Sequence, residues 1–391
     1  MFPILQQVTP DAPILVAPGL VGEDVSDITS GIRGLAERVG YRYAEVERNH
    51  RLRFLFDPLR MLGQTEFIER YLRGENPFPL SVEIDPSNAC NHDCAFCIYH
   101  SMHQPGRSER LPAARLFSAL DELRGLGCRS VLFIGGGEPM THPNTVDAVE
   151  RAVEHGMSCG LVTNGSLVRG DKARRLKKAA TYVRFSLDAA TRATHQALHG
   201  HDDFLKIVCN LRQLAWSDGA CTVGTGFFIN ERNAKEIAGC ARMVKDAGAD
   251  YIQFKSYSGL PIEAALHRRM LEELERALDL SDAKFDVHIA DRIFENHTYQ
   301  VRGYSRCHFQ GMKTVINADG WVYLCAQKRT SPSGRVGNIL EKTLAEIWSS
   351  TERQRVVENL DLLRCPYCVH DKQNKTIEFM AHFSAPHRGF Y

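Results

Sequence analysis

The sequence lacks a strong charge of either sign, and it lacks a long apolar run. Its 48 Lys and Arg residues nearly balance its 47 Asp and Glu residues, so that the formal net charge is +1. Without excess positive charge there is no bulk attraction for nucleic acid or for an anionic membrane surface. No uninterrupted apolar run approaches the roughly 18 residues that a membrane-spanning helix needs. We therefore expect neither a nucleic-acid partner nor a membrane partner, and a small polar ligand is the better expectation.

The amino-terminal residues lack the pattern of a secretory signal. The segment MFPILQQVTPDAPILVAPG has no basic n-region, and prolines interrupt it before a full apolar h-region forms. No internal repeat or low-complexity segment is visible. We therefore predict a cytoplasmic, globular protein whose 391 residues form two or three domains.

Cysteine, in contrast, is abundant, with 12 residues. We do not expect a disulfide framework, because the cytoplasm is a reducing compartment. Seven of the cysteines fall in a group of three and a group of four, which are Cys90, Cys94 and Cys97, and Cys307, Cys325, Cys365 and Cys368. The other five are scattered through apolar segments, and we expect them to be buried as small hydrophobic residues. These five are Cys128, Cys159, Cys209, Cys221 and Cys240.

Short β-rich runs alternate with helical patterns between residues 80 and about 290, as in a parallel sheet built from βα units. The predicted strands cover residues 80–84, 130–134, 158–162, 181–187, 221–229 and 251–254. Apolar residues at helical spacing lie between them, for example over 112–126, 145–154 and 234–246. Six strands without a clear seventh and eighth predict an α/β fold with an open, partial (β/α)6 barrel rather than the closed eight-stranded form.

The pattern changes on both sides of this barrel. Residues 1–79 form an N-terminal extension, to which we assign no role. The barrel covers residues 80–299, and residues 300–391 form a C-terminal domain. In that domain, residues 314–325 are typical of a β-hairpin with a Gly-containing turn, and a helix is expected from residue 344 to about 359.

The first cysteine group has the spacing C-x3-C-x2-C and follows directly on the first predicted strand. It therefore belongs to the face of the barrel where βα loops build active sites. Three thiolates at this spacing can hold three irons of a 4Fe-4S cluster and leave one iron open to another ligand. The alternative is a zinc site in which His92, His100 or His103 supplies the fourth ligand, because thiolate and imidazole also suit zinc.

Polar and glycine-rich segments follow the next three predicted strands. Three glycines after the second strand allow the backbone to approach a ligand closely, and the glutamate that follows offers a charged acceptor. We expect these groups to converge on one rim of the barrel, because they all follow strand ends. The candidates are Gly135, Gly136, Gly137 and Glu138 after the second strand, Asn164 after the third, and Ser186 and Asp188 at the end of the fourth.

Together these motifs resemble the radical S-adenosylmethionine (SAM) superfamily. Its defining loop is CxxxCxxC with an aromatic residue before the last cysteine, here Phe96, and its GGEP-type turn corresponds to residues 136–139. The resemblance implies that the open iron binds the amino and carboxylate groups of SAM and that the GGEP-type turn meets the methionyl amino group. It also implies ribose contacts from Ser186 and Asp188, and an adenine contact from Tyr99.

The four C-terminal cysteines, with the hairpin between the first two, resemble the SPASM/twitch extension of radical SAM enzymes. This resemblance implies that Cys307, Cys325, Cys365 and Cys368 hold an auxiliary 4Fe-4S cluster. No cysteine follows Cys368, so the shorter form with one auxiliary cluster fits better than the form with two. The alternative is a zinc-ribbon-like site, since four thiolates also satisfy tetrahedral zinc.

The resemblance implies an enzyme that reductively cleaves SAM to a 5'-deoxyadenosyl radical, which abstracts hydrogen from its substrate. We expect a small-molecule substrate of the sugar, nucleoside or aminoglycoside type, a two-electron oxidation in a biosynthetic pathway, and a reducing partner such as flavodoxin or ferredoxin. Acid/base candidates at strand ends are Lys255, Glu231 and Tyr257. Three alternatives stay open, which are an epimerase of such a substrate, a peptide maturase, and a zinc-stabilised binding protein without enzymatic activity.

Overall fold

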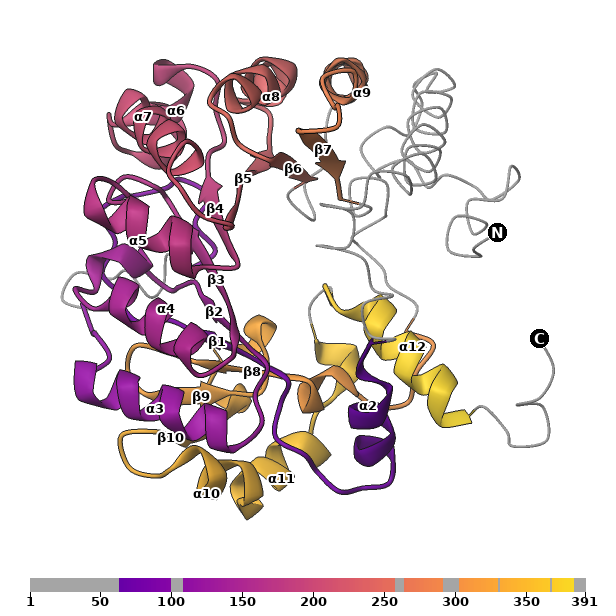
Figure 1. Cartoon of the computed structure of the whole chain (residues 1–391). Coiled ribbons are helices and arrows are strands. Elements are labelled where there is room, and N and C mark those ends of the chain that lie inside the picture. Colours follow the sequence, from indigo (N-terminus) through magenta and orange to yellow (C-terminus); the bar gives the residue numbers. More distant parts are fainter. Residues whose placement is uncertain are drawn as a thin grey trace. The chain divides into compact units, whose positions relative to one another are not determined.

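The computed structural model describes residues 63–99, 108–256, 264–290, 302–329, 331–365 and 368–382 (Figure 1). The chain divides into two compact units. One unit, Asp57–Phe185 with Cys209–Val223 and Val301–Tyr391, holds all seven clustered cysteines and is called the cysteine unit below. The second unit contains Ser186–Val208 and Gly224–Gln300. Most of the predicted N-terminal extension lies outside the described residues, and the predicted domain boundaries stay a prediction.

The sheet of the cysteine unit has the strand order β10-β9-β8-β1-β2-β3-β4. Strands β1 to β4 pair in parallel, as the alternation of strands and helices predicts. They span Ser81–Ile84, Ser130–Phe133, Ser158–Thr163 and Tyr182–Ser186. The predicted hairpin is β8 (Lys313–Ile316) paired antiparallel with β9 (Trp321–Tyr323), and β10 (Arg335–Asn338) extends it.

Strand β8 also pairs in parallel with β1, with Ser81 opposite Lys313 and Ile84 opposite Ile316. The sequence analysis did not predict this pairing. It gives β1 a neighbour on both sides, so that the backbone groups of β1 are hydrogen-bonded along both of its edges. The C-terminal hairpin is therefore a direct continuation of the parallel sheet.

The helices of the cysteine unit are amphipathic and cover the sheet. In Figure 1 the helices α3, α4 and α5 lie along the outer side of β1 to β4. Helix α4 shows why, because it buries Val146, Val149 and Ala152 at spacings of three residues and thereby turns one apolar stripe to the core. The helices of this unit are α2 (Thr65–Leu72), α3 (Ala113–Gly125), α4 (Thr145–Glu154), α5 (Asp171–Ala179), α10 (Leu344–Ser349), α11 (Thr351–Glu358) and α12 (Asp371–His382).

The second unit contains the parallel strands β5 (Thr222–Ile229), β6 (Tyr251–Ser256) and β7 (Asp286–Ile289). Strand β7 was not predicted, because only two of its four residues, Val287 and Ile289, are apolar. The helices in and next to this unit are α6 (Arg192–His199), α7 (Phe204–Ala215), α8 (Ile237–Asp246) and α9 (Ala264–Leu278). The predicted α/β class with a parallel sheet is confirmed in both units.

Four of the five scattered cysteines are buried, as predicted. The prediction is wrong for Cys209, which is exposed. It occupies a solvent-facing position of α7, whereas Ile207 and Leu211 on the same helix are fully buried. Every helix among the described residues is too short or too polar to span a bilayer.

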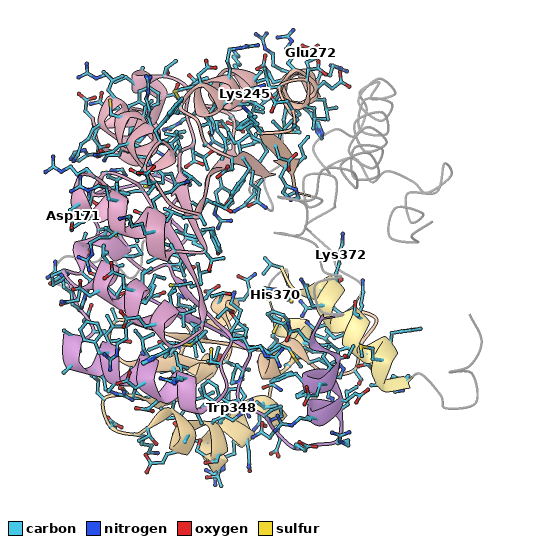
Figure 2. The ribbon with its side chains drawn as sticks, in the orientation of Figure 1. Asp171, Lys245, Glu272, Trp348, His370 and Lys372 are labelled. Carbon is cyan, nitrogen blue, oxygen red and sulfur yellow. The ribbon has the colours of Figure 1, made fainter. Side chains whose placement is uncertain are left out.

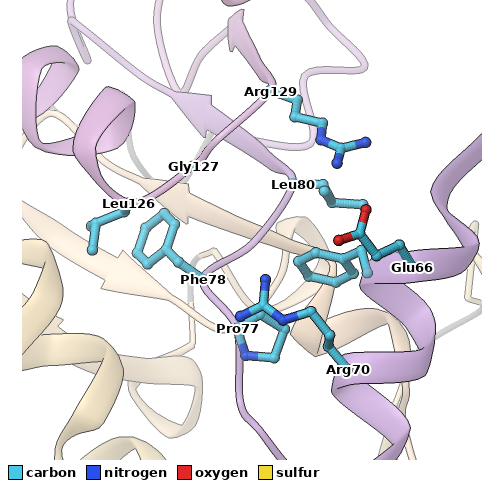
Figure 3. Close-up of a pocket in the computed structure, with 9 residues that line it drawn as sticks. Glu66, Arg70, Pro77, Phe78, Leu80, Leu126, Gly127 and Arg129 are labelled. Atoms are coloured by element: carbon cyan, nitrogen blue, oxygen red, sulfur yellow. The ribbon is translucent and has the colours of Figure 1, made fainter.

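A pocket opens at the amino-terminal ends of β1 and β2 (Figure 3). Its walls come from Phe67 and Arg70 on α2, Phe78 and Leu80 before β1, and Arg129 before β2. The three-cysteine loop follows the carboxyl end of β1, so that this pocket lies at the opposite edge of the sheet. We therefore do not assign the candidate site to it.

The C-terminal helices are joined to the segment before β1 through Trp348 (Figure 2). The indole Nε1 donates hydrogen bonds to the carbonyl oxygens of Asn76 and Pro77, at 3.1 and 3.0 Å. The Trp348 ring centroid lies 5.2 Å from that of Phe78, and the guanidinium carbon of Arg353 lies 3.4 Å from the Trp348 centroid. Trp348 therefore combines apolar packing with two satisfied carbonyl groups.

We predict that Trp348→Ala lowers the free energy of unfolding by about 3–5 kcal/mol, because it opens a large cavity. The matched variant Trp348→Phe keeps most of the packing and loses the donor, and should cost about 1–3 kcal/mol. Anaerobic chemical denaturation of both variants measures the difference. Equal stabilities of the two variants would contradict the importance of the packed ring.

Candidate metal and cofactor site

The three-cysteine loop begins six residues after the end of β1, in the position that the sequence predicts. The backbone N–H of Cys97 donates to the carbonyl oxygen of Cys94 at 3.1 Å, which closes a tight turn between these two residues. Burial raises the pKa of the Cys97 thiol, so this group is protonated at neutral pH until a metal displaces the proton. His92 is buried, and the predicted zinc alternatives His100 and His103 lie outside the described residues.

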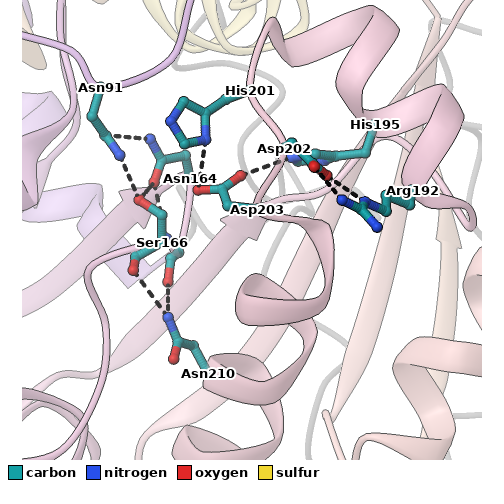
Figure 4. Close-up of polar contacts among 10 residues, drawn as sticks. Asn91, Asn164, Ser166, Arg192, His195, His201, Asp202, Asp203 and Asn210 are labelled. Carbon is teal, nitrogen blue, oxygen red and sulfur yellow. Dashed lines mark hydrogen bonds and ion pairs between the residues drawn. The ribbon is translucent and has the colours of Figure 1, made fainter.

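Asn91, inside the loop, ties it to the end of β3 (Figure 4). Its Nδ2 donates to Ser166 Oγ at 2.8 Å, and its Oδ1 accepts from Asn164 Nδ2 at 2.9 Å. Asn164 Oδ1 accepts in turn from the backbone N–H of Ser166 at 3.0 Å, and Asn210 Nδ2 donates to the Gly165 carbonyl oxygen at 2.8 Å. The sequence analysis chose Asn164 as a cofactor contact and missed Asn91, Ser166 and Asn210. No local motif marks these three residues.

The glycine turn after β2 lies against the segment that leads into the loop. A Cβ on Gly137 would lie 2.3 Å from the carbonyl oxygen of Ala89, so that only glycine fits there. The Gly137 N–H donates to the Ser87 carbonyl oxygen at 3.1 Å, and the Glu138 N–H donates to that of Ala89 at 2.9 Å. A Cβ on Gly135 would also be crowded, although less than one on Gly137, because it would lie 3.0 Å from the Gly137 carbonyl oxygen. The structure thus supplies a packing reason for two of the three predicted glycines.

Glu138 joins the ends of β2 and β3. Its Oε1 accepts from Thr163 Oγ1 at 2.6 Å and from the Met140 N–H at 2.9 Å, and its Oε2 accepts from the Asn164 N–H at 2.7 Å. Burial raises the pKa of this carboxyl, although the three hydrogen bonds lower it. A carboxylate has about four acceptor positions, so most of its capacity is used inside the protein.

A buried guanidinium, that of Arg329, lies behind the loop. Its Nη1 donates to the Tyr99 hydroxyl at 2.7 Å, its Nη2 pairs with Glu83, and its Nε lies 3.3 Å from Asp85 Oδ2. Lys313 Nζ pairs with Glu83 Oε1 at 2.5 Å. Arg329 is 1% exposed, and it follows the hairpin of the C-terminal domain, whereas Glu83 and Asp85 belong to β1 and its end.

The two carboxylates of this network differ in charge. Burial raises the pKa of Glu83, but the attraction of Lys313 and Arg329 is stronger and lowers it to about 2. Asp85 shares Arg329 with Glu83, and burial together with the Glu83 charge raises its pKa to about 7. Asp85 Oδ2 accepts from the Gly136 N–H at 3.1 Å, and Asp85 Oδ1 has no hydrogen-bond partner among the described residues. Burial also raises the pKa of the Tyr99 hydroxyl to about 12, so Tyr99 is a neutral member of the network.

The four C-terminal cysteines come together from separate segments of the chain. Burial raises the pKa of Cys307 to about 12, and the charges of Cys325, Cys368 and Cys365 contribute to the rise. Mutual repulsion of this kind requires that the four sulfur atoms be neighbours. Four clustered thiols suit either a 4Fe-4S cluster or zinc, so the donor set fits the predicted auxiliary centre.

The remaining predicted residues belong to the second unit. Asp188 is buried, its Oδ1 accepts from the Phe228 N–H at 2.5 Å, and its Oδ2 lies 3.1 Å from His199 Nε2. Its carboxylate is therefore held by protein groups on both oxygens. Lys255 Nζ lies 5.4 Å from the Phe228 ring centroid, and Glu231 is exposed. The roles of Ser186, Asp188, Lys255 and Glu231 stay predictions, and Tyr257 lies outside the described residues.

The same unit contains a histidine cluster that the sequence analysis missed. His195 and His199 lie one turn apart on α6 with stacked rings, and their centroids are 4.5 Å apart. His195 Nε2 lies 3.1 Å from Asp203 Oδ1 (Figure 4). Their spacing of four residues was the only signal in the sequence.

Two protein-family models match separate segments of the chain. The Radical SAM superfamily matches residues 84–244, and the SPASM iron-sulfur cluster-binding domain matches residues 307–372. The AdoMet-dependent heme synthase of Methanosarcina barkeri is 22% identical over 72% of this chain and 86% of its own length. The antilisterial bacteriocin subtilosin biosynthesis protein AlbA of Bacillus subtilis is 25% identical over 84% of this chain and 75% of its own length.

The solved structures share the fold. The crystal structure of Streptococcus suis SuiB bound to its precursor peptide SuiA has a TM-score of 0.59 at 17% identity, and the match covers 84% of this chain and 80% of SuiB. This match spans far more than the barrel alone. The partial barrel with its C-terminal extension is therefore an architecture that this chain has in common with known proteins.

The raised pKa of Asp85 predicts a pH dependence of stability. In the unfolded chain the pKa of this carboxyl is the ordinary 3.8, whereas in the fold its pKa is about 7. The folded state thus binds the extra proton between these values, and the free energy of unfolding falls as the pH rises from about 4 to about 7. Asp85→Asn should remove this contribution, so that its stability relative to the unchanged protein increases between about pH 4 and pH 7.

Denaturant titrations across this pH range measure the effect. Asp282→Asn is the matched control, because the hydrogen bond with Lys245 lowers the Asp282 pKa to about 2 and its charge is constant over the range. The control should therefore show the same pH slope as the unchanged protein. If Asp85→Asn had the same pH slope as the unchanged protein, the raised pKa of Asp85 would be refuted.

Proposed function

Because the chain belongs to the radical SAM superfamily and carries a SPASM domain, we propose that it is a peptide-modifying enzyme. Its cofactors are SAM, a 4Fe-4S cluster that binds SAM, and an auxiliary cluster in the SPASM domain. The proposal concerns the substrate and the outcome of the reaction. When bound, the first cluster and SAM together supply one-electron reduction and hydrogen-atom abstraction.

The residues of the three-cysteine loop would hold the first cluster. Cys90, Cys94 and Cys97 provide three thiolates, which is one fewer than the four that close a 4Fe-4S cluster. Asn91 holds this loop against the end of β3 through its two side-chain hydrogen bonds. Gly137 allows the turn after β2 to reach the loop backbone, so that backbone groups rather than side chains line this edge.

Two residues, Glu138 and Arg329, position three groups at the edge on which SAM would lie. Glu138 fixes the N–H of Asn164 and the hydroxyl of Thr163. Arg329 fixes the Tyr99 hydroxyl, and with it the ring predicted to contact adenine. All three groups are held before any ligand binds, which lowers the ordering cost of binding.

The observation that carries the peptide proposal is the extent of the match with AlbA, a protein of bacteriocin biosynthesis. The match spans 84% of this chain and so includes both iron-sulfur domains. The fold shared with SuiB, whose structure holds a precursor peptide, is consistent with it. These matches favour the peptide alternative over the sugar, nucleoside or aminoglycoside substrate expected from the sequence.

The proposed reaction is a net two-electron oxidation of the peptide. Hydrogen abstraction removes one electron and one proton from a carbon. Loss of a second electron and a second proton completes the oxidation, and this proton comes from a neighbouring atom or from the group that forms a new bond to the carbon. Cys307, Cys325, Cys365 and Cys368 would hold the auxiliary cluster with four thiolates and leave no iron open to the peptide, and the cluster would supply an acceptor for the second electron. An external one-electron donor of the flavodoxin or ferredoxin kind would reduce the first cluster.

A small-molecule substrate is the second candidate. It is favoured by the relative named a heme synthase, which matches 72% of this chain. A tetrapyrrole would require a wide apolar cavity near the cluster loop, whereas a peptide can enter in extended form. The two candidates differ in a measurable way, because only one of them consumes a peptide.

We expect the anaerobically reconstituted protein, with SAM and dithionite, to form 5'-deoxyadenosine faster when a precursor peptide encoded beside its gene is added. The peptide should become about two mass units lighter, since oxidation removes two hydrogens. Mass spectrometry and chromatography measure both products. A Cys90→Ala, Cys94→Ala, Cys97→Ala variant is the control and should form neither.

Two results would contradict this proposal. A peptide whose mass is unchanged in ordinary water, but which gains one deuterium when the reaction is run in deuterated water, would indicate epimerisation. Consumption of an iron porphyrin precursor, with no effect of the peptide, would support the second candidate.

We predict that Glu138→Ala weakens SAM binding by a factor of roughly ten to a hundred, because loss of a charged hydrogen-bond acceptor costs about 1.5–3 kcal/mol. Glu138→Gln keeps one carbonyl acceptor, so its affinity for SAM should lie between those of the unchanged protein and Glu138→Ala. Anaerobic equilibrium dialysis measures the affinity, and iron analysis verifies that each variant holds both clusters. A dissociation constant within about twofold of the unchanged protein would show that Glu138 does not position SAM.

A further inference from the structure

Asn374, on α12, connects two of the segments that supply the cysteines of the auxiliary site. It is fully buried and lies six residues after Cys368. Its Oδ1 accepts from the backbone N–H groups of His308 and Phe309, at 2.7 and 2.9 Å, immediately after Cys307. Its Nδ2 donates to the carbonyl oxygen of His370, at 3.1 Å, and lies 3.8 Å from Cys368 Sγ. His370, at the start of this helix, is labelled in Figure 2.

The hydrogen-bond partners determine which way the Asn374 amide points. Two backbone N–H donors face one side of it, and only the oxygen can accept from them. The NH2 group must therefore face the other side, where it has the His370 carbonyl oxygen and the Cys368 sulfur. The donor next to the sulfur is thus set by the surrounding backbone and does not depend on an arbitrary choice between oxygen and nitrogen.

We propose that Asn374 raises the reduction potential of the auxiliary cluster through an N–H···S contact to Cys368. Reduction adds one negative charge to a cluster, and part of that charge resides on the ligand sulfur atoms. A donor directed at the sulfur stabilises this charge, and hydrogen bonds to sulfur are one of the factors that set cluster potentials. A higher potential makes the cluster a better electron acceptor.

Two charged groups also lie near Cys368. Arg302 Nη2 donates to the Cys365 carbonyl oxygen at 2.9 Å, and Asp371 pairs with Lys375 at 2.8 Å. The backbone N–H of His370 also donates to the Cys368 sulfur, and Asn374 adds a neutral side-chain donor next to it. The proposal rests on the auxiliary cluster and is independent of which substrate the enzyme modifies.

The decisive variant is Asn374→Asp. Aspartate has the same shape, and its Oδ1 can still accept from His308 and Phe309, but it places a carboxylate oxygen where the donor was. Asn374→Ser is the second variant, because it is neutral and too short to reach the sulfur. Asn359→Asp is the matched control. It makes the same change at an exposed asparagine, whose Nδ2 donates to the backbone carbonyl oxygen of Arg355.

The experiment is an anaerobic redox titration followed by EPR spectroscopy. It is done in protein that also carries Cys90→Ala, Cys94→Ala and Cys97→Ala, so that the only cluster expected is the auxiliary one. The midpoint potential should shift downwards in Asn374→Ser and further in Asn374→Asp, and it should stay unchanged in Asn359→Asp. The EPR signal of the reduced cluster should also change in the two Asn374 variants.

Two results would overturn the proposal. One is an unchanged potential in Asn374→Ser, which would mean that the amide has no effect on the cluster. The other is loss of iron from both Asn374 variants but not from the control, which would show that Asn374 only holds the ligand segments together. Neither result bears on the peptide proposal, because no substrate or SAM is present.

Discussion

The buried ion network around Arg329 is the interaction that joins the two iron-sulfur regions of this protein. Arg329 contacts Tyr99, next to the three-cysteine loop, and pairs with Glu83 on β1, although 246 positions separate it from Glu83. Removing one member of a buried ion pair costs several kcal/mol, because the remaining charge has no solvent to stabilise it. The C-terminal hairpin is therefore bound to β1 both by the parallel β1–β8 pairing and by charge.

This network is also an electrostatic constraint on the cofactor site. Arg329 and Lys313 supply two positive charges for Glu83 and Asp85, yet Glu83 contacts both of them, so that Asp85 is left with the weaker interaction. Its raised pKa means that it can be neutral at physiological pH. Asp85 lies next to the Gly136 N–H, at the edge where a reduced cluster and the carboxylate of SAM would both bring negative charge. A neutral Asp85 would add no further negative charge there.

Candidate site residues could be named from the sequence where cysteines or a glycine turn follow a predicted strand at a recognisable spacing, and their roles stay predictions. The seven cysteines, the glycine turn and Glu138 are recognisable by spacing alone, and β1 to β6 follow from alternating patterns. Asn91, Arg329 and Asn374 could not be predicted, since each acts on a partner that only the fold brings near. Strand β7 was missed because only two of its four residues are apolar. Cys209 was predicted to be buried because residue type alone does not reveal which side of a helix faces solvent.

Both cysteine groups are held by an asparagine that lies near them in sequence, Asn91 for the loop and Asn374 for the C-terminal group. An amide is suited to this task because it accepts and donates at once and carries no charge that would titrate or repel thiolates. A lysine or arginine there would stabilise thiolates without metal, whereas a carboxylate would oppose cluster assembly. In the absence of metal, the buried thiols are protonated, as the raised pKa of Cys307 indicates. The neutral amides can therefore preserve the ligand geometry in both the metal-free and the metal-bound protein, and the cluster supplies its own charge when it binds.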